Sequence, residues 1–295
     1  MKRRALLALP IGCCLILTGC ISPSAVDDFA KASAQAASLF PAVATIPYRV
    51  CVANGQNLQL AAVTEFNPNF TFDQTKIDCK MADATSQRLQ KTYTVLATYI
   101  STLDKLAGGT APTYDANIKA LAGNIPDLTS SQQTAVSGLA SLIADLVDKG
   151  YRQNQAAKAI EKAQPWVQEL SGMLKDQLPP FLNDYISNDA DSLKSMYRGV
   201  AVFSLQGSTQ HTSPTLVTKQ FLEDKVQIQN MQNAVAAFEK IFASIAEGHT
   251  TLYTNRNKLW DKGVIQQLFQ TAISIKKQVS AVETAFKPAA ATTTK

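Results

Sequence analysis

The sequence predicts an all-α protein, an elongated helical bundle with a disulfide-stapled irregular segment near its N-terminus. Apolar residues recur every three or four positions over most of the chain, which is the pattern of amphipathic helices. The stripes are narrow, and Thr, Ser, Gln and Lys fill the other faces, as in helices that pack in bundles or coiled coils. Strand-like runs are few, and no repeat of about 20 to 50 residues is present, which argues against a solenoid.

The first helix is expected over residues 23–39. Ser22 is a suitable N-cap, and Pro23 fits the first helical position, where its missing N–H costs nothing. Pro41 and Pro47 should then break the helix.

A longer second helix should begin at Asp73, as its cap, and end at the pair Gly108-Gly109. Its apolar stripe comprises Ile77, Met81, Leu89, Tyr93, Leu96, Ile100, Leu103 and Leu106.

Three proline or glycine sites divide the middle of the chain. A third helical region is expected from Tyr114, interrupted over residues 123–126 and resumed after Ser130. A fourth should run from Gln153, with a kink or restart at Pro165 and a further bend at Pro179-Pro180. Residues 199–205 fit either a short strand or a helix end.

The last two helices carry the strongest periodicity. The first continues past Gly248 to Leu252, Leu259 and Trp260, and its stripe comprises Val217, Phe221, Val226, Ile228, Met231, Val235, Phe238, Ile241, Phe242 and Ile245. After Gly263, the final stripe comprises Ile265, Leu268, Phe269, Ile273, Ile275, Val279, Val282 and Phe286. Pro288 should end the bundle, leaving a disordered tail.

The N-terminus has the organisation of an export signal. Lys2, Arg3 and Arg4 precede an apolar stretch over residues 5–17, which is too short to span a bilayer. The stretch closes with Leu17-Thr18-Gly19-Cys20, which resembles the lipobox of bacterial lipoproteins. An ordinary secretory signal and an uncleaved anchor are the alternatives.

The lipobox resemblance implies that Gly19 and Cys20 are separated by cleavage and that Cys20 receives fatty acyl chains, including palmitate. It thus implies a signal peptide over residues 1–19. Helical periodicity and Pro288 then divide the rest into a helical bundle domain (20–287) and a tail (288–295). Ile21 stands where the family's inner-membrane retention signal has Asp. In a Gram-negative host this implies an outer-membrane anchor with the domain facing the periplasm.

Cysteine usage predicts one disulfide. Cys13 and Cys14 lie in the signal and Cys20 in the lipobox, so Cys51 and Cys79 remain in an oxidising compartment, where such a pair usually bonds. Metal ligation is the competing interpretation, but no CxxC spacing is present, and His211 and His249 are far away in sequence. The enclosed segment is rich in Asn and is the least periodic part of the domain.

Charge argues against a nucleic-acid partner. Loss of residues 1–19 removes three basic residues and no acidic one, so the formal net charge falls from +5 to +2. The remaining Lys and Arg are scattered rather than gathered on one face.

No catalytic or cofactor motif occurs in the sequence, so we expect no enzyme activity, cofactor or metal. His249 is a candidate for proton transfer or a pH-sensitive contact, although a polar-face or interface role is more common for a lone His on a helix. Asp184, Asp189 and Asp191 have the composition of a cation site without the spacing of a calcium loop, and a helix cap in a solvated turn is the simpler interpretation. Trp166 and Trp260 should anchor the core, with a contact surface marked by one of them as the alternative. Tyr93, Tyr99, Tyr185 and Tyr197 should lie in the core or at its boundary.

Three functions fit this sequence. The first is a lipid-anchored, non-enzymatic structural or interaction protein that contacts the lipid bilayer through Cys20 and another envelope protein through its helices. The second is a membrane-active helical protein, and the third is an envelope enzyme with an unrecognised site. The first is favoured because long amphipathic helices are present and no catalytic constellation is recognisable.

Overall fold

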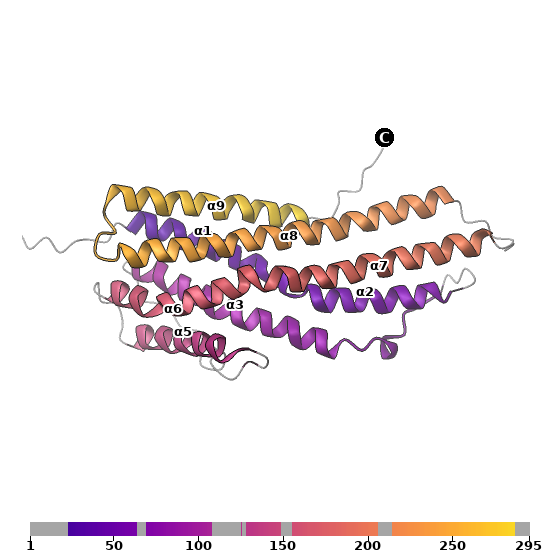
Figure 1. Ribbon diagram of the computed structural model, residues 1–295, viewed down its shortest axis with the longest axis horizontal. Helices are drawn as coiled ribbons and strands as arrows, with labels where there is room; N and C mark the ends of the chain where they lie inside the picture. Colours follow the sequence, from indigo (N-terminus) through magenta and orange to yellow (C-terminus); the bar gives the residue numbers. More distant parts are fainter. Residues whose placement is uncertain are drawn as a thin grey trace, which may run out of the picture.

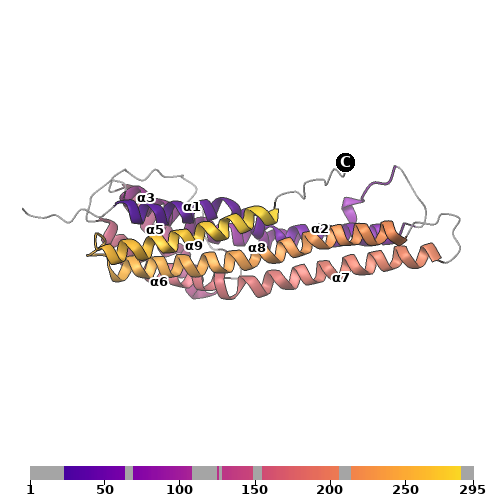
Figure 2. The same ribbon diagram turned by 90° about the horizontal axis from the view of Figure 1, so that it is seen from above.

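Residues 23–63, 69–107, 125, 128–148, 155–205 and 214–286 are described in a computed structural model of the protein. Every regular element in these ranges is helical, and the helices pack side by side into an elongated bundle (Figures 1 and 2), which confirms the predicted fold class. The elements are α1 (Pro23–Ala44), α2 (Ile46–Ala61), the 3₁₀ helix η1 (Gln74–Lys76), α3 (Lys80–Ala107), α5 (Ser130–Asp148), α6 (Gln155–Asp176), α7 (Leu178–Leu205), α8 (Pro214–Thr254) and α9 (Lys262–Phe286).

The prolines near the N-terminus divide the helices differently from the prediction. Pro41 lies inside α1 rather than ending it, and Pro47 lies in the first turn of α2, where no backbone N–H is needed. Thr45 joins the two helices: its N–H donates to Pro41 O at 3.1 Å, and its carbonyl accepts from Arg49 N at 3.0 Å. Residues 46–61 are therefore helical, and the irregular part of the disulfide loop is shorter than expected.

Asp73 does not cap the long helix, which was predicted to begin there. Its side chain accepts from Thr75 N at 3.0 Å and caps η1 instead, while α3 begins at Lys80, whose N–H donates to Asp78 Oδ1 at 3.3 Å.

The later breaks are also weaker than predicted. Pro165 lies within a continuous α6, and Pro179-Pro180 occupy the first turn of α7, where proline is tolerated. Residues 199–205 continue α7, which decides between the two alternatives in favour of a helix end. The helical region predicted from Tyr114 and the C-terminal tail lie outside the described residues.

The bundle is wide at one end and narrow at the other (Figure 1). The wide end contains α1, α3, α5, α6, α9 and the second half of α8, whereas α2, α7 and the first half of α8 continue into the narrow end. We call the narrow end the arm. Within it α7 contacts both α2 and α8.

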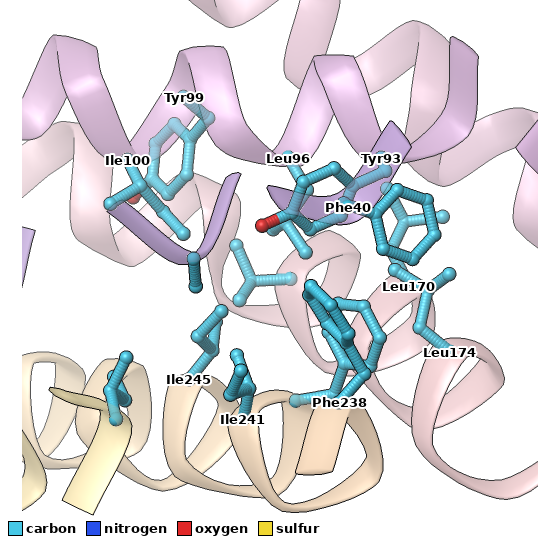
Figure 3. Close-up of a cluster of buried hydrophobic side chains, with 14 of the residues drawn as sticks. Phe40, Tyr93, Leu96, Tyr99, Ile100, Leu170, Leu174, Phe238, Ile241 and Ile245 are labelled. Atoms are coloured by element: carbon cyan, nitrogen blue, oxygen red, sulfur yellow. The ribbon is translucent and has the colours of Figure 1, made fainter. Parts of the chain in front are cut away.

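Aromatic rings from three helices fill the centre of the core (Figure 3). Phe40 of α1 lies 4.1 Å from Tyr93 of α3 between ring centroids, and 5.4 and 5.7 Å from Phe238 and Phe242 of α8. These side chains are at most 3% exposed, so the cluster removes a large apolar area from water where α1, α3 and α8 meet.

Candidate functional site

The predicted disulfide is present in the structure. Cys51 of α2 and Cys79, the residue before α3, are bonded, with their Cα atoms 5.8 Å apart. The prediction of one Cys51–Cys79 bond is therefore confirmed.

The residues before Cys79 lie along one face of α2. Beyond the disulfide, Ile77 packs so closely on Gly55 that a Cβ there would lie 2.8 Å from Ile77 Cγ1. One turn further, the Gln59 amide brackets Asp73, donating to its carbonyl at 2.9 Å and accepting from its N–H at 2.7 Å. We call residues 73–79 the strap, because they run antiparallel to α2 and contact it at successive turns.

The strap compensates for a weak helix. In α2 only Ile46, Pro47 and Val50 are buried, all in its first turns. The later turns therefore depend on α7 and the strap for their packing.

His249 lies in the core and not on a polar or interface face as expected. It is 1% exposed, its Nε2 lies 2.8 Å from Tyr99 Oη, and its Nδ1 lies 2.7 Å from Gln164 Oε1. An amide oxygen only accepts, so Nδ1 donates to Gln164 and Nε2 accepts from the Tyr99 hydroxyl. Burial lowers the pKa of His249 to about 3 and raises that of Tyr99, so both are neutral near pH 7.

The three aspartates of α7 form neither a cap nor a turn. They lie in the middle of the helix, with Asp184 and Asp191 exposed and Asp189 only 7% exposed. Burial raises the pKa of Asp189 to about 6 against the opposing effect of Arg49. Among the described residues, no group of three or more His, Cys, Asp or Glu side chains is placed to hold a metal ion.

Asp27 of α1 and Asp104 of α3 form a carboxyl pair that the sequence does not predict. Lys31 donates to Asp27 at 2.8 Å and lowers the pKa of that carboxyl, whereas burial and the neighbouring Asp27 raise the pKa of Asp104 to about 6. Seventy-seven residues separate the two acids, so no local motif identifies the pair.

The tryptophans have different environments. Trp166 of α6 packs against the core, where its ring occupies the space beside Gly138 of α5. Trp260, however, is 50% exposed in the turn between α8 and α9, so the prediction that it anchors the core is wrong. The tyrosines lie as predicted: Tyr93 and Tyr99 are buried, and Tyr185 and Tyr197 are at the boundary.

Part of the predicted apolar stripes faces solvent. Val226 of α8 is 44% exposed, Met81 of α3 is 81% exposed, and Phe269 and Ile273 of α9 are 45% and 44% exposed. These residues keep helical spacing but lie off the packed faces, which periodicity alone does not reveal.

The first half of α8 has an apolar face that no described helix covers. Its opposite side packs on α7, where Tyr197 lies against Phe221 and its hydroxyl donates to Asp224 Oδ2 at 2.6 Å. The outer side is a shallow hollow lined by Thr215, Thr218, Lys219, Leu222, Glu223 and Val226. We call these six residues the uncovered face of α8.

The N-terminal helices also have a membrane-like composition. By length and hydropathy, the stretch Val26–Ala61 is long and apolar enough to cross a bilayer. In the bundle, however, Phe29, Phe40 and Val43 of α1 are at most 1% exposed, as in the core helix of a globular domain. Cys20 and the lipobox lie outside the described residues.

Comparisons of the chain with protein-family models, with curated proteins and with solved structures found no match.

Proposed function

We propose that the protein is a bacterial envelope lipoprotein, anchored through acylated Cys20, that acts as a non-enzymatic interaction module. Its contact surface for another envelope protein is the uncovered face of α8. The lipobox-like Leu17-Thr18-Gly19-Cys20 supports the anchor, and the exposure of Leu222 and Val226 supports the contact surface.

The observation that carries the proposal is that α9 ends before it reaches the first half of α8. Ser274 of α9 meets Ser244 of α8 at 3.2 Å, and α9 then runs antiparallel to α8 for twelve more residues, to Phe286. Twelve residues back along α8 from Ser244 is Gln232, so the end of α9 lies near Gln232. The helix α9 therefore does not reach Val226 or Leu222. Leu222 and Val226, 54% and 44% exposed, share one side of α8 because they are four residues apart.

A partner with an apolar helix or ridge fits this surface. It would extend the row occupied by α9 and remove Leu222 and Val226 from water, at about 25 cal/mol per Å² of apolar area. Thr215, Thr218 and the ion pair of Lys219 with Glu223 would form a polar rim around that apolar centre, which is the usual anatomy of a protein interface.

The environments of the titratable residues support a non-enzymatic role. His249 has both ring nitrogens occupied inside the core, and Asp184 and Asp191 are exposed on the solvent side of α7. A general base requires reach to a substrate proton, which the burial of His249 denies.

The proposal is tested by photocrosslinking in the native envelope. A photoreactive phenylalanine analogue at position 222 should give one discrete product with a second envelope protein. With the analogue at position 218 instead, Leu222→Glu and Val226→Glu should lower the yield of this crosslinked product about tenfold or more. The reason is that the partner would then bury unpaired carboxylates in an apolar contact.

The same analogue at position 81 is the matched control, since Met81 is 81% exposed but lies on α3, away from this face. Equal products from positions 81 and 222 would contradict a specific surface. A product containing two copies of this chain would show self-association instead of a separate partner, and products with lipid alone would show that this face is not a protein contact.

A further inference from the structure

The wide end of the bundle brings the start of α1 beside the end of α8. The Phe29 ring, two turns into α1, occupies the space over Gly248, where a Cβ would lie only 2.3 Å from Phe29 Cε2. From that contact, α1 extends back to Pro23 and α8 extends on to Thr254, toward the same end (Figure 1). At the other end of α9, the Arg49 guanidinium lies 5.8 Å from the Phe286 ring centroid, which agrees with this direction of packing.

Cys20 is covalently close to this end. Three residues of chain lead from Cys20 to Pro23, so their Cα atoms are at most about 11 Å apart, whatever the conformation of the connection. Acyl chains on Cys20 therefore hold the membrane surface near the start of α1 and near the turn between α8 and α9.

This turn has the side chains of a lipid-headgroup contact. Leu259 is 1% exposed and fixes the turn to the core, and its neighbour Trp260 is directed outward at 50% exposure. Lys258 and Lys262 flank it and are both exposed. Asp261 is engaged at the start of α9, where its carboxylate accepts from Gly263 N at 2.8 Å.

Trp and Lys are the residues that suit a membrane interface. An indole combines a large apolar ring with one N–H donor and is enriched at the headgroup layer, and lysines beside it are attracted to anionic lipids.

We propose that the α8–α9 turn is a membrane-contact site, in which Trp260, Lys258 and Lys262 lie in the headgroup layer beside the anchor. This inference rests on the proposed acylation of Cys20. It orients the bundle end-on to the membrane, so that the arm and the uncovered face of α8 point away from the lipid surface.

The test uses tryptophan as its own depth probe. The sequence has two tryptophans, so in the chain from Cys20 onward, which includes every described helix, Trp166→Phe leaves Trp260 as the only indole. In the chain that begins at Cys20, Cys51 and Cys79 are bonded to each other, so Cys20 is the only free thiol. This thiol is coupled to a maleimide phospholipid in vesicles of phosphatidylcholine with about one quarter phosphatidylglycerol. With brominated acyl chains in the vesicles, Trp260 should lose about half of its emission and shift to the blue, as an interfacial indole does.

The matched control moves the indole to the arm. Trp166→Phe and Trp260→Phe are combined with Leu58→Trp, since Leu58 is 72% exposed on α2. Its emission should remain unchanged by the brominated lipid. Equal quenching at positions 58 and 260, or no quenching at 260, would overturn the proposal.

If the Trp166→Phe variant fails to fold, a comparison that keeps Trp166 replaces it. The otherwise unchanged chain and its Trp260→Phe variant are then compared on the same vesicles, and only the unchanged chain should be quenched. Because coupling supplies the anchor chemically, this test does not depend on acylation in cells. Absence of a fatty-acid label on Cys20 in cells would reject the anchor, whereas an unquenched Trp260 on coupled vesicles would reject the orientation.

Discussion

Gly248 of α8 lies beneath the Phe29 ring of α1, and Gly138 of α5 lies beneath Trp166 of α6 in the same manner. At both positions a Cβ would fall 2.3 Å from a ring carbon, inside the distance of any real contact. Glycine is otherwise unfavourable within a helix by about 1 kcal/mol relative to alanine. Its presence is therefore explained by the close approach of a ring from another helix.

We predict that Gly248→Ala lowers the free energy of unfolding by about 1 to 3 kcal/mol, because overpacking against Phe29 outweighs the gain in helix propensity. The matched control is Gly172→Ala in α6, where a Cβ meets no atom within 4 Å and stability should rise by up to about 1 kcal/mol. Urea denaturation of both variants provides the measurement. A Gly248→Ala protein as stable as wild type would show that Phe29 moves aside freely.

His249 should make the bundle sensitive to acid. Its pKa is about 3 when folded and returns toward 6.5 on unfolding, so the unfolded chain binds the extra proton. The contribution of His249 is complete above about pH 6.5 and is lost as the pH falls toward 3. Asp104 and Asp189 act oppositely: with pKa values raised to about 6, their protonated forms favour folding below that pH.

The His249 contribution is isolated by comparing wild type with His249→Leu across pH 4 to 8. We expect the variant to be less stable at pH 7, by about 1 to 3 kcal/mol, because leucine has no acceptor for the buried Tyr99 hydroxyl and no donor for Gln164. The difference between the two proteins should shrink as the pH falls. A difference independent of pH would contradict the neutral, buried state of this imidazole.

At the scale of the elements, α2 and the strap depend on each other. Only the first turns of α2 contribute buried side chains, and the disulfide, the Gly55–Ile77 contact and the Gln59–Asp73 bracket then hold the strap along it. Each contact is modest, but the disulfide also restricts the unfolded chain. This arrangement explains why a helix with so little buried surface persists in the arm.

Replacing both cysteines, Cys51→Ser with Cys79→Ser, should lower the free energy of unfolding by about 3 to 4 kcal/mol in the chain-entropy model. Hydrogen exchange should quicken first in the strap, since α2 keeps its contacts with α7. Dithiothreitol should lower the free energy of unfolding of the wild type by a similar amount and leave that of the double variant unchanged. Unaltered exchange in residues 73–79 would show that the other two contacts suffice.

At the scale of the whole molecule, the long axis separates two surfaces. Figure 2 shows the α8–α9 turn at one end of the bundle and the start of α8 toward the other. Trp260 belongs to that turn, and Leu222 and Val226 belong to the first half of α8. In the proposed arrangement, lipid contact and protein contact are therefore made at opposite ends. An elongated bundle suits that role because its length sets the distance between them.

Acylation of Cys20 should decide where the protein resides. We predict that Cys20→Ala removes labelling by a fatty-acid probe and releases the protein from the membrane fraction. Each buried methylene contributes about 0.8 kcal/mol, so several acyl chains hold far more firmly than one. The Cys51→Ser, Cys79→Ser protein should keep its label, and an unlabelled wild type would disprove the anchor.

The residue pattern alone predicts a helical protein and a bond between Cys51 and Cys79. Apolar spacing identifies a helix and its amphipathic faces locally, which is why α9 is predicted with nearly its observed ends. The same spacing wrongly extends the preceding helix to Trp260, because α8 ends at Thr254 and Leu259 is buried from a turn. Counting cysteines needs no geometry. Local proline rules were less reliable, because tertiary packing keeps Pro41 and Pro165 inside helices.

Which apolar residues are covered depends on how the helices pack against one another. Val226 and Trp260 belong to apolar patterns but are exposed, since α9 stops short of the first and Leu259 directs the second outward. His249 is in the core because Tyr99 and Gln164, distant in sequence, supply its hydrogen bonds. The physical reason is that periodicity describes one helix at a time, whereas burial depends on the length and placement of its neighbours.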